Sequence, residues 1–312
     1  MTRAAVADGV TTLPELFARI LTEHAERPAI TEAGEVLTYR ELDERSDAVS
    51  GLLRVHGVSH GDRVALRVAH SSGGWAALLG ILKRGAVHVT TEPGGPGCPG
   101  GPVVRRGGAS FCLTDRARKA RRIPGLVVIP FADAGPHTAV HHSAPNPRLA
   151  TAACVVAPSA SARRASVVDH ADIVAHAEAW LGDLNIPALR GQRFGYLGDV
   201  PLSAVLLSLW VGLAQGAHLV VLPPLAWLIE QGLHDELSRR GVTALVLPAA
   251  ALHHVVGEGV EGFAALRLLV VEGDGPAPEA GRILVGAGFD GCLVHVVGAP
   301  GTTSYRVVRT ET

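Results

Sequence analysis

The sequence predicts an α/β protein with two layered subdomains, in which mainly parallel sheets are flanked by helices. Three observations predict it. Strand-like and helix-like segments alternate along most of the chain, and the strand-like segments are short apolar runs such as LVVL at 219–222. The length of 312 residues is enough for one large or two ordinary domains with a substantial core. A single small module stapled by disulfides is therefore excluded.

In the first half, apolar spacing predicts two amphipathic helices separated by a hairpin, followed by alternating strands and helices. The first helix, at 13–25, places Leu16, Phe17 and Ile20 on one face, and Thr12 is available to cap it. The elements expected after it are a hairpin at 29–39, a helix at 39–55, a strand at 63–68, a helix at 74–84 and a strand at 86–90. The segment 93–108, rich in Pro and Gly, is expected to cross the surface.

A change of composition at 136–147 predicts the boundary between the subdomains, which we place at 1–147 and 148–312. In the second half we expect strands at 152–156, 193–198, 218–222, 244–247, 266–271 and 293–297, and helices at 172–180, 204–213, 225–240 and 250–256. Eight residues are expected to be buried because their spacing fits helix faces or inner strands: Leu42, Leu52, Leu82, Val155, Leu206, Leu219, Val246 and Leu269.

The composition excludes several classes of function. The chain has 28 basic and 29 acidic residues, so its net charge of −1 argues against binding nucleic acid or an anionic membrane through bulk charge. The uncharged stretch 203–222 contains the break Gln215-Gly216, which favours a buried helix, a turn and a strand over a membrane span. The first twenty residues lack the continuous apolar segment of a signal peptide, so we expect a cytoplasmic protein.

Several motifs together resemble the adenylate-forming enzymes, meaning the adenylation domains of nonribosomal peptide synthetases and the related aryl-acid and acyl-CoA ligases. The similar segments, in the order of the family, are LTYREL at 37–42, GV at 57–58, GDRV at 61–64, GILKRGA at 80–86, LWVGLAQGAHLVVL at 209–222, GVTALVL at 241–247 and LRLLVVEGDGPAPE at 266–279. The resemblance implies the fold of the family's N-terminal core, without its β-rich third subdomain or its C-terminal lid.

The loop that wraps the ATP phosphates in this family departs from the pattern. The family has TSGTTGxPKG, whose glycines let backbone N–H groups approach an anion. The corresponding segment here, at 156–165, reads VAPSASARRA. A proline replaces the first glycine and has no N–H to donate. The degenerate positions are Pro158, Ser159, Ser161, Arg163 and Arg164. A phosphate cradle is not expected, although the two arginines with the two serines remain an alternative anion site.

The second ATP element of the family, YGPTET, is also altered. The matching segment begins at Val297, and Gly301 stands where the resemblance places a glutamate that helps to hold the metal ion. The family's lid lysine has no counterpart, since Lys83 and Lys119 are the only lysines of the chain and lie in other segments. The resemblance therefore implies that no cofactor is used and that ATP and Mg binding are lost.

A ligand pocket is expected at strand ends, where α/β sheets usually hold ligands. The string GDVPLS at 198–203 resembles the HN(F/Y)PLSSPG of aryl-acid activators, which suggests a small carboxylic acid as ligand. The predicted lining is Tyr196, Asp199, Ser203, Glu272, Gly273, Asp274 and Gly298. No catalytic residue and no metal site is assigned, because pairs such as His170 with Asp172 are expected by chance among 15 histidines.

Three functions follow. The first is a catalytically inactive adenylation-domain-like protein that serves as a binding or structural partner in nonribosomal peptide or related biosynthesis. The second is an enzyme that uses the remaining cleft for ATP-independent acyl or aryl transfer. The third is an adenylating enzyme completed in trans. The expected partners are a second copy of the chain in a homodimer or a biosynthetic protein such as a synthetase or a carrier protein.

Overall fold

The computed structural model describes most of the chain. The described residues are 12–68, 71–90, 104, 107–115, 125–131, 152–156, 166–182, 189–198, 205–252, 263, 266–273, 282–284, 286, 288–297 and 304–309. The helices are α1 (Leu13–His24), α2 (Tyr39–Val55), α3 (Ser72–Lys83), α5 (His170–Gly182), α6 (Leu206–Ala214), α7 (Leu225–Glu230) and α8 (Leu233–Arg239). The strands are β1 (Pro28–Glu32), β2 (Glu35–Thr38), β3 (Arg63–Arg67), β4 (Val87–Val89), β5 (Phe111–Thr114), β6 (Val127–Pro130), β7 (Ala152–Val156), β8 (Ser166–Asp169), β9 (Arg193–Leu197), β10 (His218–Leu222), β11 (Ala244–Pro248), β12 (Leu268–Glu272), β13 (Cys292–Val297) and β14 (Ser304–Arg309).

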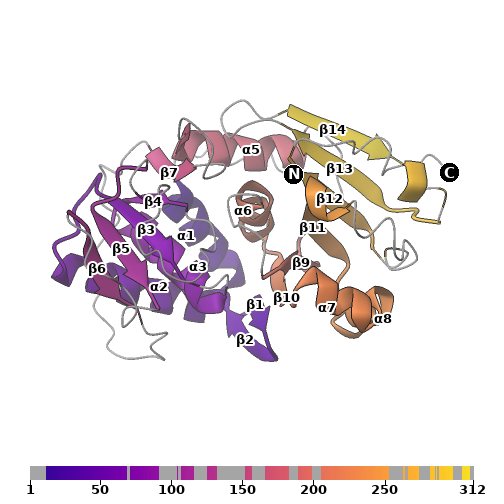
Figure 1. The fold of residues 1–312 in the computed structure, drawn as a ribbon, viewed down its shortest axis with the longest axis horizontal. Coiled ribbons are helices and arrows are strands. Elements are labelled where there is room, and N and C mark those ends of the chain that lie inside the picture. Colours follow the sequence, from indigo (N-terminus) through magenta and orange to yellow (C-terminus); the bar gives the residue numbers. More distant parts are fainter. Residues whose placement is uncertain are drawn as a thin grey trace.

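These strands form two sheets, and the predicted α/β class with mainly parallel sheets is confirmed (Figure 1). The larger sheet has the order β14-β13-β12-β11-β9-β10-β1-β2, and the smaller has the order β6-β5-β3-β4-β7-β8. Antiparallel pairing occurs between β1 and β2, between β13 and β14, and between β7 and β8. The other pairs are parallel, which places the carboxyl ends of the inner strands of each sheet at one edge.

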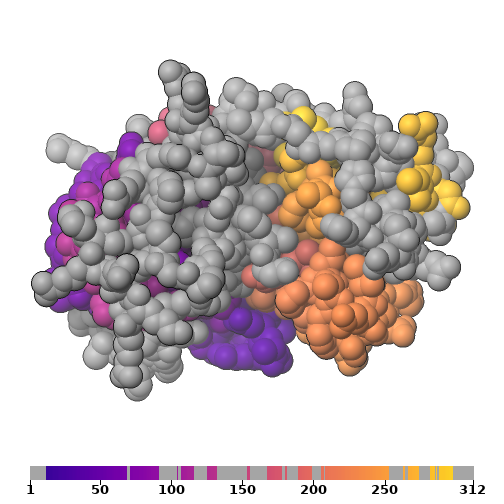
Figure 2. Space-filling model, viewed as in Figure 1, coloured from indigo at the N-terminus to yellow at the C-terminus, as the bar shows by residue number. Residues whose placement is uncertain are grey.

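Strand pairing crosses the predicted subdomain boundary in both directions. The hairpin β1–β2 from the first half joins the larger sheet, because Ile30 of β1 pairs in parallel with Leu219 of β10. The strands β7 and β8 from the second half complete the smaller sheet. In Figure 2 the indigo surface of the N-terminal segment lies directly against the orange surface of the second half. The two sheets therefore do not coincide with residues 1–147 and 148–312, and that division stays a prediction.

The main core lies between the sheets, around α1, α3, α5 and α6 (Figure 1). A second core lies under α7 and α8, on the other face of the larger sheet. Of the eight residues predicted to be buried, the structure buries six: Leu42, Leu82, Leu206, Leu219, Val246 and Leu269. Leu52 is only partly buried, because it packs at the margin of the main core. The side chain of Val155 lies outside the described residues.

Local sequence signals explain how the first two helices begin. Thr12 and Glu15 form a capping box at α1, and Thr38 and Glu41 form the same arrangement at α2. In each, the threonine hydroxyl accepts a hydrogen bond from the glutamate N–H, and the glutamate carboxylate accepts one from the threonine N–H. Both boundaries are thus set by four consecutive residues.

Some predicted elements differ from the structure. The helix predicted at 225–240 is divided into α7 and α8, because Gly232 between them has a φ of +88°, outside the helical region. The strands β5, β6, β8 and β14 were not predicted. The stretch 203–222 contains α6 and β10, which confirms the predicted helix, turn and strand. Within the part of the chain that the structure describes, no helix combines the length and apolarity that crossing a membrane requires.

The helices α2 and α3 approach each other closely at Gly80. A Cβ atom at this position would lie 2.7 Å from the Ser46 carbonyl oxygen and 2.7 Å from Val49 Cβ. Lys83, one turn farther along α3, pairs its Nζ with Asp43 and Asp47 of α2 at 2.6 Å each. This lysine therefore joins two helices, and Gly80 makes their contact possible.

The Gly80→Ala variant is expected to lower the free energy of unfolding by about 1–3 kcal/mol, because the added methyl group forces the two helices apart. Gly286→Ala is the matched control, since a Cβ there meets no atom within 4 Å. Urea unfolding of both variants measures the difference. Equal stability of Gly80→Ala and the unmodified protein would show that the helices separate without cost.

Candidate functional site

The candidate site lies at the carboxyl edge of the larger sheet, where β9, β11, β12 and β13 run in parallel. This edge is the usual position of ligands in open α/β sheets. Of the predicted lining, Tyr196 lies on β9, Glu272 ends β12 and Gly273 follows it. The other four predicted residues, Asp199, Ser203, Asp274 and Gly298, lie outside the described residues.

Glu272 is a buried carboxyl group at the beginning of α6. Its side chain is 8% exposed, and its Oε1 accepts a hydrogen bond from the Ser208 N–H at 3.0 Å. The N-cap residue of α6, Val205, supplies no side-chain hydrogen bond, so Glu272 satisfies a first-turn N–H from 64 residues away. Burial raises the pKa of Glu272 to about 7, and Ser208 opposes this rise only in part. Near neutral pH this carboxyl can therefore both accept and release a proton.

The turn after Glu272 is held by β13. Gly273 has a φ of +106°, a conformation that favours glycine, and its N–H donates to the Val296 carbonyl at 3.0 Å. The ring of His295, whose Nε2 lies 2.9 Å from the Gly273 carbonyl oxygen, donates a hydrogen bond to it. The position at which the chain leaves β12 is thus determined by hydrogen bonds on both sides of Gly273.

Tyr196 belongs to an aromatic cluster that connects the two sheets. It is fully buried, and its hydroxyl accepts a hydrogen bond from Trp75 Nε1 of α3 at 3.0 Å. Trp75 packs edge to face against Trp210 of α6, with ring centroids 5.7 Å apart. Burial is the main reason why the pKa of the Tyr196 hydroxyl is raised far above its usual value. Tyr196 therefore stays protonated and acts in packing and positioning, not as a base.

A second carboxylate accepts hydrogen bonds at the N-terminus of α3. Glu32, the last residue of β1, accepts hydrogen bonds from the Ser72 N–H at 2.8 Å and from the Ser72 hydroxyl at 3.1 Å. A carboxylate is favourable at this end of a helix because the helix dipole is positive there. Glu32 and Glu272 thus play corresponding parts at α3 and α6, the two helices that carry the aromatic cluster.

The segments that correspond to the ATP elements connect described strands. The loop with Pro158, Ser159, Ser161, Arg163 and Arg164 lies outside the described residues. It joins the antiparallel strands β7 and β8, in which Val156 pairs with Ser166. Gly301 also lies outside the described residues, between β13 and β14, where Val297 pairs with Ser304. The described strands on either side of each segment are thus antiparallel neighbours at the edge of a sheet.

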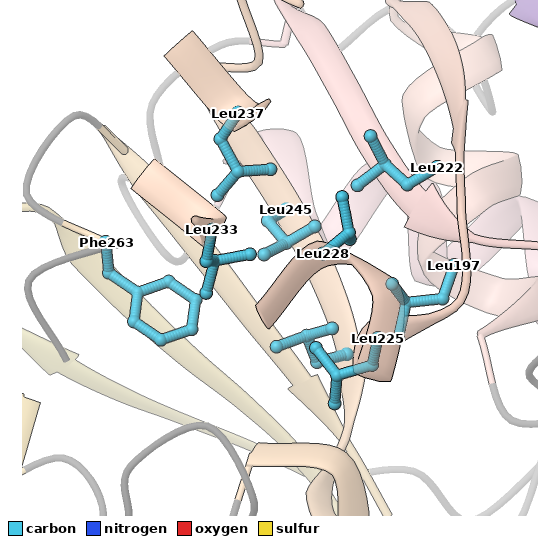
Figure 3. Close-up of a pocket in the computed structure, with 9 residues that line it drawn as sticks. Leu197, Leu222, Leu225, Leu228, Leu233, Leu237, Leu245 and Phe263 are labelled. Carbon is cyan, nitrogen blue, oxygen red and sulfur yellow. The ribbon is translucent and has the colours of Figure 1, made fainter. Parts of the chain in front are cut away.

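Three other features bear on function: groups that could hold a metal ion, the pair His170 and Asp172, and an apolar pocket. In the described part of the chain, no group of three His, Cys, Asp or Glu side chains could hold a metal ion. His170 and Asp172 do not form a dyad, because the His170 Nδ1 accepts from the Leu13 N–H and Asp172 accepts from the Asp169 N–H. A small apolar pocket under α7 and α8 is lined by eight leucines and Phe263 (Figure 3). It has no space for a water molecule, so it is a narrow gap between packed side chains and not a ligand pocket.

Among the described residues at this edge, Glu272 is the carboxyl group whose pKa is raised to about 7. The sequence predicted Tyr196 and Glu272 as lining residues, which stays a prediction, and gave no indication that Trp75, Trp210 and Ser208 neighbour them. Ser208 carried a signal, since it is the single polar side chain of the apolar run 206–214. Nothing in the local sequence indicated that Trp75 lies beside Tyr196, because 121 residues separate them.

Comparisons of the sequence agree with this fold. Residues 17–173 match the family described as AMP-binding enzyme. Surfactin synthase subunit 1 of Bacillus subtilis is 24% identical over 301 residues, which cover 94% of this chain and 8% of that protein. A long-chain-fatty-acid–CoA ligase of Salmonella typhimurium is 40% identical over 87 residues, which cover 28% of this chain and 16% of the ligase. The chain thus spans only a small part of the length of these relatives.

Solved structures show the same architecture. The N-terminal subdomain of Klebsiella oxytoca NpsA in complex with 3-hydroxybenzoyl-AMSN is similar with a TM-score of 0.79 and 24% identity, over 96% of this chain and 76% of that one. NpsA-ThdA, an artificially fused adenylation–PCP di-domain, is similar with a TM-score of 0.78 and 22% identity, over 97% of this chain and 56% of that one. At these identities the likeness establishes the fold alone.

Proposed function

Because this chain belongs to the AMP-binding enzyme family, we propose that it is an adenylation-domain-like protein of nonribosomal peptide biosynthesis that does not form adenylates. Its similarity to the synthetases extends over nearly the whole chain. In this proposal the protein binds a small carboxylic acid at the carboxyl edge of the larger sheet. It acts as a binding or structural partner of a synthetase or carrier protein.

The observation that carries the proposal is a contrast within the chain. The fold of the N-terminal part of an adenylation domain is present, whereas the two segments that resemble ATP elements lack the residues on which ATP chemistry depends in the family. Proline, serine and alanine replace the glycines of the phosphate loop, and Gly301 replaces the carboxylate of the second element. A backbone without these glycines cannot bring its N–H groups to the phosphates in the same way, and a missing carboxylate removes a metal ligand.

The isolated protein is expected to show no ATP–pyrophosphate exchange with amino acids or aryl acids. Each lost stabilising contact costs about 3–4 kcal/mol of transition-state stabilisation, so two of them reduce the rate by several orders of magnitude. Exchange assayed with a panel of acids, alongside calorimetric titration with ATP and Mg²⁺, measures this. The control is an intact adenylation domain in the same assay. Clear exchange would refute the inactivity and would favour a true adenylating enzyme.

A carrier-protein partner is supported by the structural similarity to a fused adenylation–PCP di-domain. Light scattering after size exclusion, with and without an added carrier protein, tests it. A complex larger than the chain alone is expected in the mixture. A homodimer would appear in the protein alone, and two separate peaks in the mixture would contradict the carrier-protein role.

A further inference from the structure

Three buried histidines connect the start of the chain to its second half. We call α1, β1 and β2, residues 13–38, the N-terminal segment. The three histidines are His24 at the end of α1, His170 at the beginning of α5 and His218 at the beginning of β10. Each takes part in a hydrogen bond between the N-terminal segment and the second half.

His170 holds the first residue of α1 through an unprotonated nitrogen. Its Nδ1 accepts a hydrogen bond from the Leu13 N–H at 3.2 Å. Burial lowers the pKa of His170 to about 4, and the Glu15 carboxylate of α1 opposes this only in part. The Asp172 carboxylate of α5 accepts from the Asp169 N–H, and α6, which packs against α5, has no charged side chain. Protonation of His170 therefore removes the acceptor of the Leu13 N–H.

His218 lies between an arginine and a threonine. Arg193 of β9 donates to the His218 Nδ1 at 3.3 Å, because a guanidinium has only donors. The proton of the neutral ring is therefore on Nε2, which donates to Thr31 Oγ1 of β1 at 2.6 Å. Burial lowers the pKa of His218 to about 4, and the charge of Arg193 adds to the effect. The neighbouring charged residues of β1 and α8, Glu32 and Arg240, bind other side chains. A second proton on His218 would thus face the Arg193 cation.

His24 differs because an anion lies beside it. Arg190 donates to the His24 Nε2 at 3.2 Å, and Glu23 Oε2 lies 3.9 Å from the same nitrogen. Glu23 also accepts a hydrogen bond from Arg190 at 2.9 Å. A proton taken up by His24 would find a carboxylate next to it, so we do not assign His24 the same role as the other two histidines.

We propose that His170 and His218 form an acid-sensitive attachment, which holds the N-terminal segment while both rings are neutral and favours its release when they take up protons. A histidine in water has a pKa of about 6.5, so the released state binds more protons than the closed state as the pH falls from 6.5 toward 4. The attachment is therefore strongest above pH 6.5. It involves neither ATP nor an acid ligand and is independent of the proposed function.

Hydrogen exchange of the full chain, followed by mass spectrometry at pH 7 and pH 5, tests this attachment. Each ring is expected to favour release about twentyfold between these two pH values. Exchange within 13–38, corrected for the intrinsic rate, is therefore expected to rise on the order of a hundredfold. Helix α3 is the internal reference, because it packs mainly against α2, and its exchange is expected to change much less.

The double variant His170→Asn with His218→Asn removes the titration. The asparagine Oδ1 can accept a hydrogen bond in place of Nδ1 but does not take up a proton in this pH range. The rise within 13–38 is expected to fall below about threefold. His176→Asn is the matched control, since His176 is also a buried histidine of α5 with a pKa lowered to about 4, and its ring lies beside Trp180 of the same helix. This control is expected to keep the full rise.

Three results would overturn the proposal. An equal rise in α3 and in 13–38 would mean that acid loosens the whole chain, and no rise in 13–38 would mean that the segment stays attached. A rise that persists in the double variant, or that disappears in His176→Asn, would place the acid sensitivity in other groups. The comparison of 13–38 with α3 is made in the unmodified protein, so a double variant that fails to fold leaves the test intact.

Discussion

Replacing Tyr39 by alanine is expected to lower the free energy of unfolding by about 3–5 kcal/mol, the range observed when a buried aromatic side chain is truncated. Tyr39 is fully buried at the beginning of α2 and packs against Phe17 of α1, with ring centroids 5.9 Å apart. Its hydroxyl donates to the Ala217 carbonyl at 2.7 Å and lies 3.3 Å from the Leu213 carbonyl. It thus ties two N-terminal helices to the end of α6.

Tyr39→Phe separates the two contributions of this side chain. It retains the ring but removes the hydroxyl that donates to the Ala217 carbonyl, which is expected to cost about 1–3 kcal/mol. Val55→Ala, at the other end of α2, is the control because Val55 is 79% exposed. Urea unfolding followed by circular dichroism compares the three variants. Equal stability of Tyr39→Phe and the unmodified protein would show that the hydroxyl contributes only to position.

The difference in free energy of unfolding between Glu272→Gln and the unmodified protein is expected to change with pH. It is expected to shift in favour of the variant by up to about 3 kcal/mol between pH 5 and pH 8. The pKa of Glu272 is raised from 4.5 to about 7 in the folded state. A folded state that holds a proton more tightly is most stable below pH 4.5 and loses this stability as the pH rises through 7. Glutamine does not titrate, so the variant avoids the loss.

The stability that depends on the buried histidines changes with pH in the opposite direction. The variant is therefore compared with the unmodified protein at each pH. Burial lowers the pKa of His170, His176 and His218 to about 4, with Arg193 adding to the effect at His218. Their contribution is present above pH 6.5 and is lost as the pH falls toward 4. The histidine contribution is the same in both proteins and cancels in the difference.

Glu44→Gln, at an exposed position of α2, controls for the removal of a negative charge. A pH-independent difference would show that Glu272 is not protonated near neutral pH.

The sequence by itself determined the features that depend on neighbouring residues. The capping boxes at Thr12 and Thr38 and the hairpin at 29–39 follow from patterns within a few residues, and the parallel class of the strands follows from their alternation with helices along the chain. The resemblance to adenylate-forming enzymes also came from local motifs, and the family and fold comparisons confirm it. Tyr196 and Glu272 could be proposed because strand ends are recognisable in the sequence.

Only the tertiary structure decided which distant segments meet. The exchange of strands between the sheets, with β1 beside β10 and β7 beside β4, has no local signal, because an apolar strand can pair with any other. The same holds for the Glu272 carboxyl on the Ser208 N–H and for the Tyr39 hydroxyl on the Ala217 carbonyl. The spacing of apolar residues indicates which side of a helix or strand is buried. The partner that covers it is chosen by packing and hydrogen bonding over the whole chain, and that choice places the candidate site between α6 and the edge of the larger sheet.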